Sequence, residues 1–336
     1  MKITPDASLL PYNTFGINAM ADYLIEYNSV AELQDFLKSE PVISNRILHI
    51  GSGSNLLFLN DFKGVVLHSL INSITKVNET SGSVLLEAGS GVIWDDLVAY
   101  CVENGLGGIE NLSLIPGEVG AAAVQNIGAY GVEVQDLIRT IKTIETASGL
   151  EREFSTAECR YAYRESVFKS SLKGKYIITS VIFELQKQPE FKLNYLHLEK
   201  EVIKNGEVNL KNIRQTIIAI RESKLPDPKT AGNAGSFFMN PVVSKEKFRT
   251  LQSEFPQMPH YYISEAEEKI PAGWLIDQCS WKGKSIGNAG VHDKQALVLV
   301  NRGGATGSEI VHLAEQIQHS VKERFGIGLQ PEVNYI

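Results

Sequence analysis

The segment from Pro116 to Gly131 constrains this chain most, because eight of its sixteen residues are glycine or alanine. A packed helix normally presents bulky side chains, so such a run indicates that the backbone itself lies close to a neighbour. Two interpretations stay open. A flat ring or a diphosphate could lie against the backbone, with the amides of Gln125 and Asn126 supplying hydrogen bonds. Alternatively, a helix could pack closely on a sheet, which also needs small residues.

The bulk composition predicts a folded chain of two or three domains, with 336 residues, 43% apolar and 21% charged. The net charge of −7 argues against a nucleic-acid partner, although a local basic cluster could still bind an anionic substrate. Three widely spaced cysteines predict reduced thiols, with no disulfide framework and no metal site. The first residues lack the apolar core of a signal peptide, and no apolar run could span a bilayer. We therefore expect a cytoplasmic protein with no membrane partner.

Periodicity predicts mixed α/β structure along the chain. Residues 1–70 should hold a helix that begins at the capping box Ser29–Glu32 and ends at Pro41, followed by strands at 46–50 and 64–68. Residues 71–205 should hold strands at 83–88, 138–146 and 176–186, and a helix whose buried face carries Ile93, Trp94, Leu97, Val98 and Cys101.

Residues 206–326 should open with a helix whose apolar residues are Leu210, Ile213, Ile217 and Ile220, and which stops at 225–228 because proline cannot continue it. A buried strand is predicted at 296–300. Thr306 should cap a last helix that ends at Gly326. An extended tail follows.

A glycine-rich loop, Gly51-Ser-Gly-Ser-Asn55, follows the strand at 46–50. Its small residues would let backbone amides approach a pyrophosphate. It is neither the dinucleotide fingerprint, since Leu56 stands where a third glycine would fall, nor a P-loop. On the residues alone, a tight turn is as good an interpretation as a ligand loop.

Three further motifs carry candidate chemistry. Residues 159–166 hold two arginines, two tyrosines and a serine, and form either an anion clamp or an ordinary charged turn. Ser236 lies among glycines and phenylalanines in 232–241; it lacks the surroundings of a hydrolase nucleophile but could donate a proton. Glu332, five residues from the chain end, matters only if the tail folds back over a site.

Taken together and in this order, these motifs resemble the UDP-N-acetylenolpyruvoylglucosamine reductase family. The shared patterns run from Asn13 to the C-terminus and include Gly51–Asn55, Ile115–Gly117 with Gln125–Gly131, Tyr163–Ser166, Gly232–Phe238 and Gln330–Val333. The resemblance is to the longer subclass, in which a tyrosine loop reaches over the substrate. It implies an α+β chain with the vanillyl-alcohol-oxidase-like FAD-binding fold, in which two α/β subdomains hold FAD and a third α/β domain binds substrate. The implied division is 1–70, 71–205 and 206–326, with the tail 327–336 packing back near the active site.

The resemblance also implies the site residues. Ser236 matches the proton donor, and Arg164 and Glu332 match the pair that stabilises the enol intermediate. Substrate-binding positions are Tyr195, Lys224, Asn240 and Gln295. FAD contacts are Gly51, Ser52, Gly53, Ser54, Asn55, Pro116, Gly117, Gly120, Gln125, Asn126, Gly128, Ala129 and Tyr130. One departure is Met239, where the family pattern has lysine.

The implied reaction is ping-pong. NADPH reduces non-covalently bound FAD and leaves, and the flavin then reduces UDP-N-acetylglucosamine enolpyruvate to UDP-N-acetylmuramate, a precursor of peptidoglycan. A monomer is expected. Rival interpretations are a flavoprotein oxidase of the same superfamily, which would use oxygen; a colourless sugar-nucleotide binding module; and a serine hydrolase around Ser236, for which no base is in place.

Overall fold

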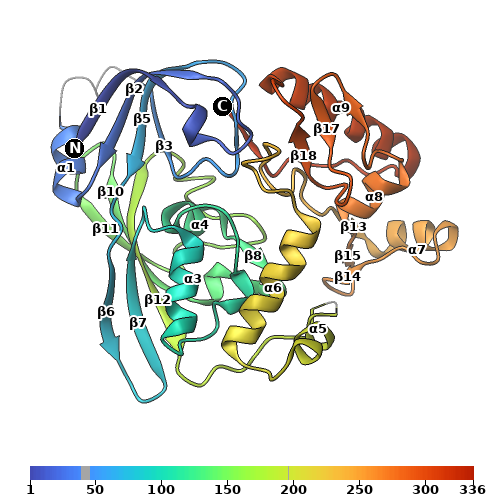
Figure 1. Cartoon of the computed structure of the whole chain (residues 1–336), viewed down its shortest axis with the longest axis horizontal. Coiled ribbons are helices and arrows are strands. Elements are labelled where there is room, and N and C mark those ends of the chain that lie inside the picture. The colour runs from blue at the N-terminus through green and yellow to red at the C-terminus, as the bar shows by residue number, and fades with distance from the viewer. Residues whose placement is uncertain (39–45, 196) are drawn as a thin grey trace. The chain divides into compact units, whose positions relative to one another are not determined.

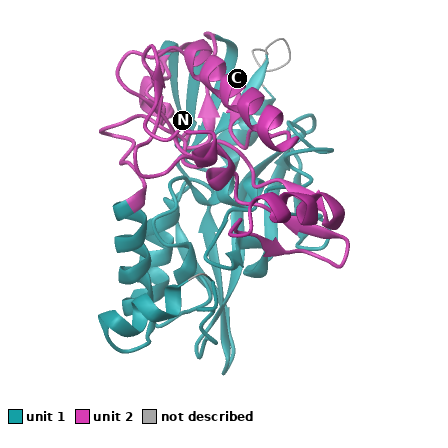
Figure 2. Ribbon diagram, turned by 90° about the vertical axis from the view of Figure 1, so that its right-hand side faces the viewer, with its two compact units in different colours: residues 1–7, 21–52, 62–223 teal, residues 8–20, 53–61, 224–336 magenta. Residues whose placement is uncertain are grey.

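The computed structural model describes residues 1–38, 46–195 and 197–336, which form two compact units. Unit 1 consists of residues 1–7, 21–52 and 62–223, and unit 2 consists of residues 8–20, 53–61 and 224–336 (Figure 2). Each unit is therefore assembled from three stretches of chain. The division at 70 and 205 predicted from the sequence stays a prediction.

A four-stranded sheet in unit 1 has the order β1-β2-β5-β3, in which β5 is parallel to both β2 and β3. Its strands are β1 (Lys2–Ser8), β2 (Met20–Tyr27), β3 (Ile47–Ile50) and β5 (Phe62–Ser69). Helix α1 (Val30–Leu37) buries Leu33 and Phe36 against this sheet. Ser29 caps α1 as predicted, but Glu32 accepts from the amide of Asn28 rather than closing a capping box. The predicted stop at Pro41 lies outside the described residues.

The second sheet of unit 1 has five antiparallel strands in the order β11-β10-β12-β7-β6 (Figure 1). The strands are β6 (Ile74–Glu79), β7 (Ser83–Gly89), β10 (Ile138–Glu145), β11 (Glu151–Ser155) and β12 (Tyr176–Gln186). Helices α3 (Trp94–Glu103) and α4 (Val119–Gln125) contribute to the apolar cluster that covers it. Ile93 was predicted on the buried face of α3, but it is 45% exposed because it precedes the helix as its N-cap.

The remaining elements of unit 1 surround these layers. They are η2 (Glu110–Leu112), β8 (Gly128–Ala129), β9 (Val132–Glu133), η3 (Val134–Asp136), α5 (Leu198–Asn205) and α6 (Leu210–Lys224). In α6, Ile213 and Ile217 are buried in a cluster with residues of α5. The helix ends directly before the predicted stop at 225–228.

Unit 2 contains short sheets and three helices. Its elements are η1 (Leu10–Tyr12), β4 (Leu56–Leu57), β13 (Val242–Ser244), α7 (Lys245–Glu254), β14 (Tyr261–Tyr262), β15 (Glu267–Lys269), α8 (Ala272–Gln278), β16 (Ser285–Ile286), β17 (Ala289–Val291), β18 (Leu299–Asn301), α9 (Gly307–Phe325) and β19 (Asn334–Tyr335). Helix α9 has the predicted capping box between Thr306 and Glu309, and Gly326 ends it at φ 64°.

The strand predicted at 296–300 is shorter than expected. It runs from Leu299 to Asn301, since a turn in which the Val298 amide bonds the Gln295 carbonyl occupies the preceding residues. Ala296 and Val298 are nevertheless buried, so burial rather than strand geometry explains their apolar character.

Cys101 and Cys159 are buried free thiols, and Cys279 is a partly buried one. Within residues 1–38, 46–195 and 197–336, no helix has the length and apolarity needed to cross a bilayer. The same residues contain no group of His, Cys, Asp or Glu side chains arranged to hold a metal ion.

Candidate active site

The small residues of 116–131 serve packing on one side of α4. Gly120, Ala122 and Ala123 are buried towards the five-stranded sheet. A Cβ on Gly120 would lie 2.9 Å from the Cβ of Ser90, so no larger residue fits there without a shift. Close helix–sheet packing therefore accounts for this half of the segment.

The other side of the segment is accessible to solvent, and its side chains are small. Pro116 and Ala121 are exposed, and Gly117 and Gln125 are half-buried. The loop that follows β3 adjoins this surface, since a Cβ on Gly51 would lie 3.3 Å from the Cβ of Ala121. A flat ring or a diphosphate needs such a surface, with small side chains beside hydroxyl and amide groups such as those of Ser52 and Gln125. These residues fit FAD.

A buried ion pair lies directly beneath this surface. Glu118 precedes α4, is 4% exposed, and its carboxylate accepts from His68 Nε2 at 3.0 Å. His68 Nδ1 lies 3.7 Å from Glu26 Oε1. Burial alone would lower the pKa of His68, but the hydrogen bond and charge of Glu118, together with Glu26, raise it. His68 therefore lies where its protonated form would face the carboxylate of Glu118, next to Gly51.

The turn 159–166 binds the C-terminal end of α4. The last carbonyls of a helix have no partner within it. Tyr161 donates to the Ala123 carbonyl at 2.9 Å, and Ser166 donates to the Val124 carbonyl at 2.7 Å. Arg164, at φ 59°, donates to the carbonyls of Asn126 at 3.2 Å and Gly128 at 2.7 Å. The turn thereby fixes the predicted catalytic Arg164 against the predicted flavin segment.

Two more predicted residues lie at this end of α4. Asn126 is fully buried at φ 46°, and its amide bonds Glu133 and the Ala162 carbonyl, so the chain itself uses its polar atoms. Tyr130 is half-buried, and its ring meets that of Tyr195 edge to face with centroids 6.1 Å apart. The predicted tyrosine loop therefore rests on the end of the predicted flavin segment.

In unit 2, Ser236 lies on an extended segment that runs between residues 297–298 and the C-terminal tail. On one side it bridges to Val298, and the Phe237 amide donates to the Leu297 carbonyl at 2.8 Å. On the other side the Glu332 amide donates to the Phe237 carbonyl at 2.8 Å. Phe237 and Phe238 are buried and anchor the segment, while Ser236 is exposed. The structure thus brings Ser236 next to Glu332, 96 positions away, through the backbone of Phe237.

The chain end also reaches the glycine-rich loop within unit 2. Strand β19 pairs in parallel with β4, and Asn55 Nδ2 donates to the Glu332 carbonyl at 3.2 Å. Gly53 has φ 68°, and a Cβ there would lie 1.9 Å from the Tyr12 carbonyl oxygen, so only glycine fits. Gly53, Ser54 and Asn55 belong to unit 2, whereas Gly51 and Ser52 belong to unit 1.

Two predicted substrate residues each lie next to the first turn of α8. Asn240 Oδ1 accepts from the Ala272 amide at 2.8 Å. Gln295 Oε1 would lie 3.1 Å from a Cβ on Gly273. Lys224 is the exposed last residue of α6. The predicted catalytic and substrate-binding residues are divided between the units. Arg164 and Tyr195 lie in unit 1, and the other five lie in unit 2: Lys224, Ser236, Asn240, Gln295 and Glu332.

Sequence reasoning missed a charged cluster beside Tyr130. Arg221 is half-buried on α6, and burial lowers the pKa of its guanidinium, while Tyr130 and Asp95 oppose that effect. Asp95 binds Arg214, seven residues before Arg221. That spacing puts the two arginines on one face of a helix, which is the signal that could have found them.

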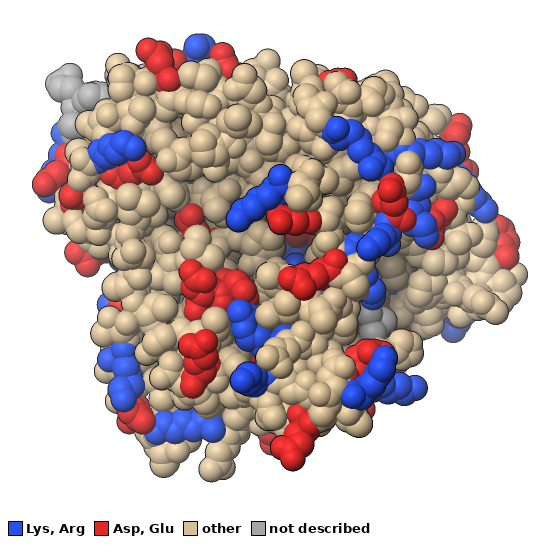
Figure 3. All heavy atoms as spheres, viewed as in Figure 1, with Lys and Arg blue, Asp and Glu red and all other residues tan. Residues whose placement is uncertain are grey.

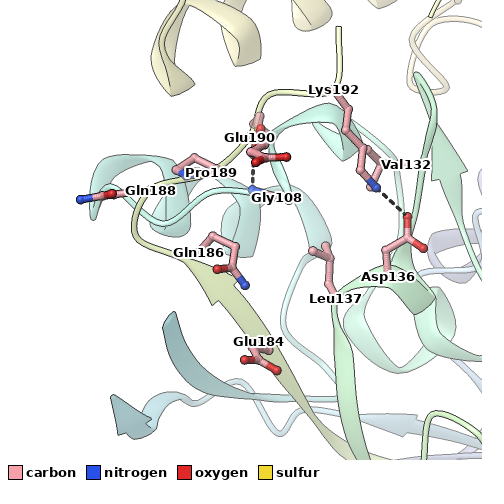
Figure 4. A pocket seen from close by; sticks show the side chains of 11 residues that line it. Gly108, Val132, Asp136, Leu137, Glu184, Gln186, Gln188, Pro189, Glu190 and Lys192 are labelled. Atoms are coloured by element: carbon pink, nitrogen blue, oxygen red, sulfur yellow. Dashed lines mark hydrogen bonds and ion pairs between the residues drawn. The ribbon is translucent and has the colours of Figure 1, made fainter. Parts of the chain in front are cut away.

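A cavity of about 380 Å³ in unit 1 is a separate feature (Figure 4). Four carboxylates line it, those of Glu110, Asp136, Glu184 and Glu190, and Lys192 pairs with Asp136 at 3.3 Å. Such walls would repel a diphosphate. None of the predicted site residues lines this cavity. On the molecular face drawn in Figure 3, acidic and basic side chains are interspersed.

The first comparison defines the class of protein. Residues 21–155 match the family model of the FAD binding domain. A solvent-stable cholesterol oxidase has a TM-score of 0.50 to this chain at 12% identity, covering 98% of this chain and 86% of that one, which shows a shared fold. The chain therefore has the predicted vanillyl-alcohol-oxidase-like FAD-binding fold, and it is a flavoprotein whose cofactor is FAD.

Further matches define the family. Residues 227–336 match the C-terminal domain of UDP-N-acetylenolpyruvoylglucosamine reductase. Proteins of that name from Bacteroides fragilis and Porphyromonas gingivalis are 53% and 51% identical, and cover 98% and 100% of this chain and the same shares of their own. The crystal structure of the reductase from Thermus caldophilus has a TM-score of 0.67 at 21% identity, covering 99% of this chain and 98% of that one. This chain belongs to the UDP-N-acetylenolpyruvoylglucosamine reductase family.

Proposed function

We propose that this enzyme reduces UDP-N-acetylglucosamine enolpyruvate to UDP-N-acetylmuramate, with NADPH as the reductant. Relatives that match the chain over its full length are named as reductases of this enolpyruvyl sugar nucleotide. The observation that carries the proposal is the placement of Ser236. Its segment is anchored by two buried phenylalanines and lies beside Glu332, while the serine itself faces outwards where a substrate can reach it.

Bound FAD would supply the redox chemistry, a hydride transfer from NADPH to the terminal carbon of the enolpyruvyl double bond. Once the hydride is bound, negative charge builds on the adjacent carbon and the substrate carboxylate. Arg164 would bind that carboxylate, because a fixed guanidinium stabilises charge as it develops. Ser236 would then donate its hydroxyl proton to the adjacent carbon and regain one from solvent. Glu332 assists only when protonated, as a hydrogen-bond donor.

The proposed binding roles follow the geometry of each unit. The open surface of 116–130 and the loop 51–55 would hold FAD with small side chains, hydroxyls and amides. Lys224 and Tyr195 would bind the substrate diphosphate. Asn240 and Gln295, which each lie next to the first turn of α8, would bind the sugar nucleotide. The contact of Tyr195 with Tyr130 supports a position for the tyrosine loop close to the flavin segment.

The use of NADPH, the monomeric state and the cytoplasmic location are part of the same proposal. Free cysteines support a reducing compartment, because Cys101 and Cys159 are buried thiols rather than disulfide partners. The proposal also includes a division of the chain. Segments 1–70 and 71–205 would bind FAD, segment 206–326 would bind substrate, and the tail 327–336 would pack back near the active site.

The test is the stoichiometry of the full reaction with product identification. Enzyme, NADPH and the enolpyruvyl substrate should yield one sugar-nucleotide product per NADPH consumed, and the product should contain two hydrogens more than the substrate by mass spectrometry. Consumption of NADPH that depends on oxygen and yields no new sugar nucleotide would contradict the proposal and favour an oxidase.

A further inference from the structure

Leu114 has an unusual backbone conformation at the entrance to the flavin segment. Its φ is 57°, in the left-handed region that aliphatic side chains rarely adopt. The following residues restrict the path further, because Ile115 precedes a proline and Pro116 has a fixed φ. The conformation of Leu114 therefore sets the direction in which Ile115–Gly117 leaves the preceding turn. Strained residues persist only where the surrounding structure holds them.

Side chains from two helices hold both backbone groups of Leu114. Its amide donates to Asp95 Oδ1 at 2.5 Å, and Asp95 lies in the first turn of α3. Its carbonyl accepts from Arg221 Nε at 3.2 Å, and Arg221 lies in the last turns of α6. Neither bond belongs to a helix or a sheet, so side chains rather than regular structure bond both backbone groups of Leu114.

Asp95 also binds α6 directly. Its two carboxylate oxygens accept from Arg214 Nη1 at 2.6 Å and Nη2 at 2.9 Å, a bidentate pair. The side chains of Arg214 and Asp95 are only 15% and 25% exposed, so solvent screens the pair less than a surface pair. Burial alone would raise the pKa of Asp95, but Arg214 and the Leu114 amide lower it, so the carboxylate is charged at neutral pH.

We propose that Asp95 is a positioning residue for FAD: with Arg214 and Arg221 it holds Leu114 left-handed, so that Ile115–Gly117 is already in its binding conformation in the apoprotein. The inference rests on the proposed flavin contacts of Pro116 and Gly117. Preorganisation of this kind raises affinity by removing the cost of ordering a loop upon binding.

The first test is a series of variants at Leu114 itself. Leu114→Asn and Leu114→Gly accept a positive φ, whereas Leu114→Val resists it more than leucine does. The dissociation constant of FAD is measured by quenching of flavin fluorescence on titration with apoprotein. Leu114→Val should raise it about tenfold, and Leu114→Asn and Leu114→Gly should stay within about threefold of the wild type. Equal effects of all three variants would overturn the proposal.

The second test compares neighbouring aspartates in the same helical turn. Asp95→Asn removes the charge that binds Arg214, whereas Asp96→Asn removes the same charge from an exposed position. Asp95→Asn should weaken FAD binding about tenfold and alter the visible circular dichroism of the bound flavin, because charge-assisted bonds are about twice as strong as neutral ones. Asp96→Asn should change neither quantity.

Two outcomes separate positioning from general stability. With FAD at saturation, Asp95→Asn should keep kcat within about threefold of the wild type, and its apoprotein, although destabilised by loss of the partly buried ion pair, should remain fully folded at the temperature of the titration. A fall in melting temperature that accounts for the whole loss of FAD affinity would overturn the positioning role. A wild-type apoprotein that binds no FAD would overturn both this inference and the proposed function, whereas tight binding by wild type and by Asp95→Asn alike would overturn this inference alone.

Discussion

Ser236 shows how a single side chain is placed by its neighbours rather than by its own contacts. The buried rings of Phe237 and Phe238 fix the segment, the Phe237 carbonyl accepts from the Glu332 amide, and the Phe237 amide bonds the opposite neighbour. A neutral hydroxyl is a weak acid, so its proposed role depends on charge stabilisation elsewhere, chiefly by Arg164.

Ser236→Ala therefore separates the two half-reactions. Reduction of the flavin by NADPH should keep its wild-type rate, since no proton from Ser236 is needed. Reoxidation by the enolpyruvyl substrate should slow at least about 100-fold, the usual loss when a general acid is removed. Stopped-flow absorbance at the flavin band measures both rates. Loss of flavin reduction by NADPH, or an undiminished second step, would contradict the assigned role.

His49 provides a prediction for pH. Its Nε2 lies 2.7 Å from the Tyr27 hydroxyl, and burial, followed by the charge of nearby His68, lowers the pKa of His49 to about 4. Because the folded state keeps His49 neutral while the unfolded chain protonates it near 6.5, its contribution to stability is complete above about pH 6.5 and falls towards pH 4, by up to about 3 kcal/mol. The raised pKa of His68 acts in the opposite sense, since that contribution is lost as pH rises through its folded-state pKa.

The free energy of unfolding, measured with urea between pH 7 and pH 4, should therefore fall less steeply in His49→Gln than in the wild type. Parallel pH profiles for the two proteins would show that His49 is not kept neutral by the fold.

At the scale of elements, α4 is a short helix whose last carbonyls are bound by side chains of the turn 159–166. The sequence left two interpretations of this segment open, an anion clamp and a charged turn. In the structure the turn caps α4, and it also holds Arg164 in position. The capping box of α9 and the extent of α6 were predictable, because they depend on residues three or four positions apart. The pairing of Asp95 with Arg214 joins residues 119 positions apart, which periodicity does not reveal.

Tyr161→Phe tests the capping of α4. It removes the hydroxyl that donates to the Ala123 carbonyl and leaves that buried carbonyl without this donor. The free energy of unfolding of the apoprotein should fall by about 1 kcal/mol, the usual net value of one hydrogen bond. Tyr100→Phe, at an exposed tyrosine of α3, is the matched control and should change it by less than about 0.5 kcal/mol. Equal effects of the two variants would refute the capping role.

At the scale of the molecule, unit 2 brings together segments from the beginning, the first quarter and the end of the chain. The family resemblance identified residues 51–55, 236 and 332 as parts of one site. Local sequence patterns could not show that these residues lie close together. The reason is that β19 pairs with β4, and the Asn334 amide donates to the Asn55 carbonyl at 3.0 Å, across 279 positions. Such contacts leave no periodic trace in a single sequence.

Asn334→Pro tests this return of the tail. Proline removes the amide that bonds Asn55 and disrupts pairing with β4, so FAD affinity and the rate of substrate reduction should both fall. Asn334→Ala keeps the backbone amide and should stay within about threefold of the wild type in both measurements. If the two variants behave alike in FAD titration and in steady-state assays, the tail does not organise the loop.

The most direct test of the account is the visible absorption spectrum of the purified holoenzyme under anaerobic conditions. On addition of NADPH the flavin bands should bleach, and on addition of the enolpyruvyl sugar nucleotide they should return, with UDP-N-acetylmuramate as the product. Bands that bleach with NADPH but stay bleached when that substrate is added would contradict the proposed reaction.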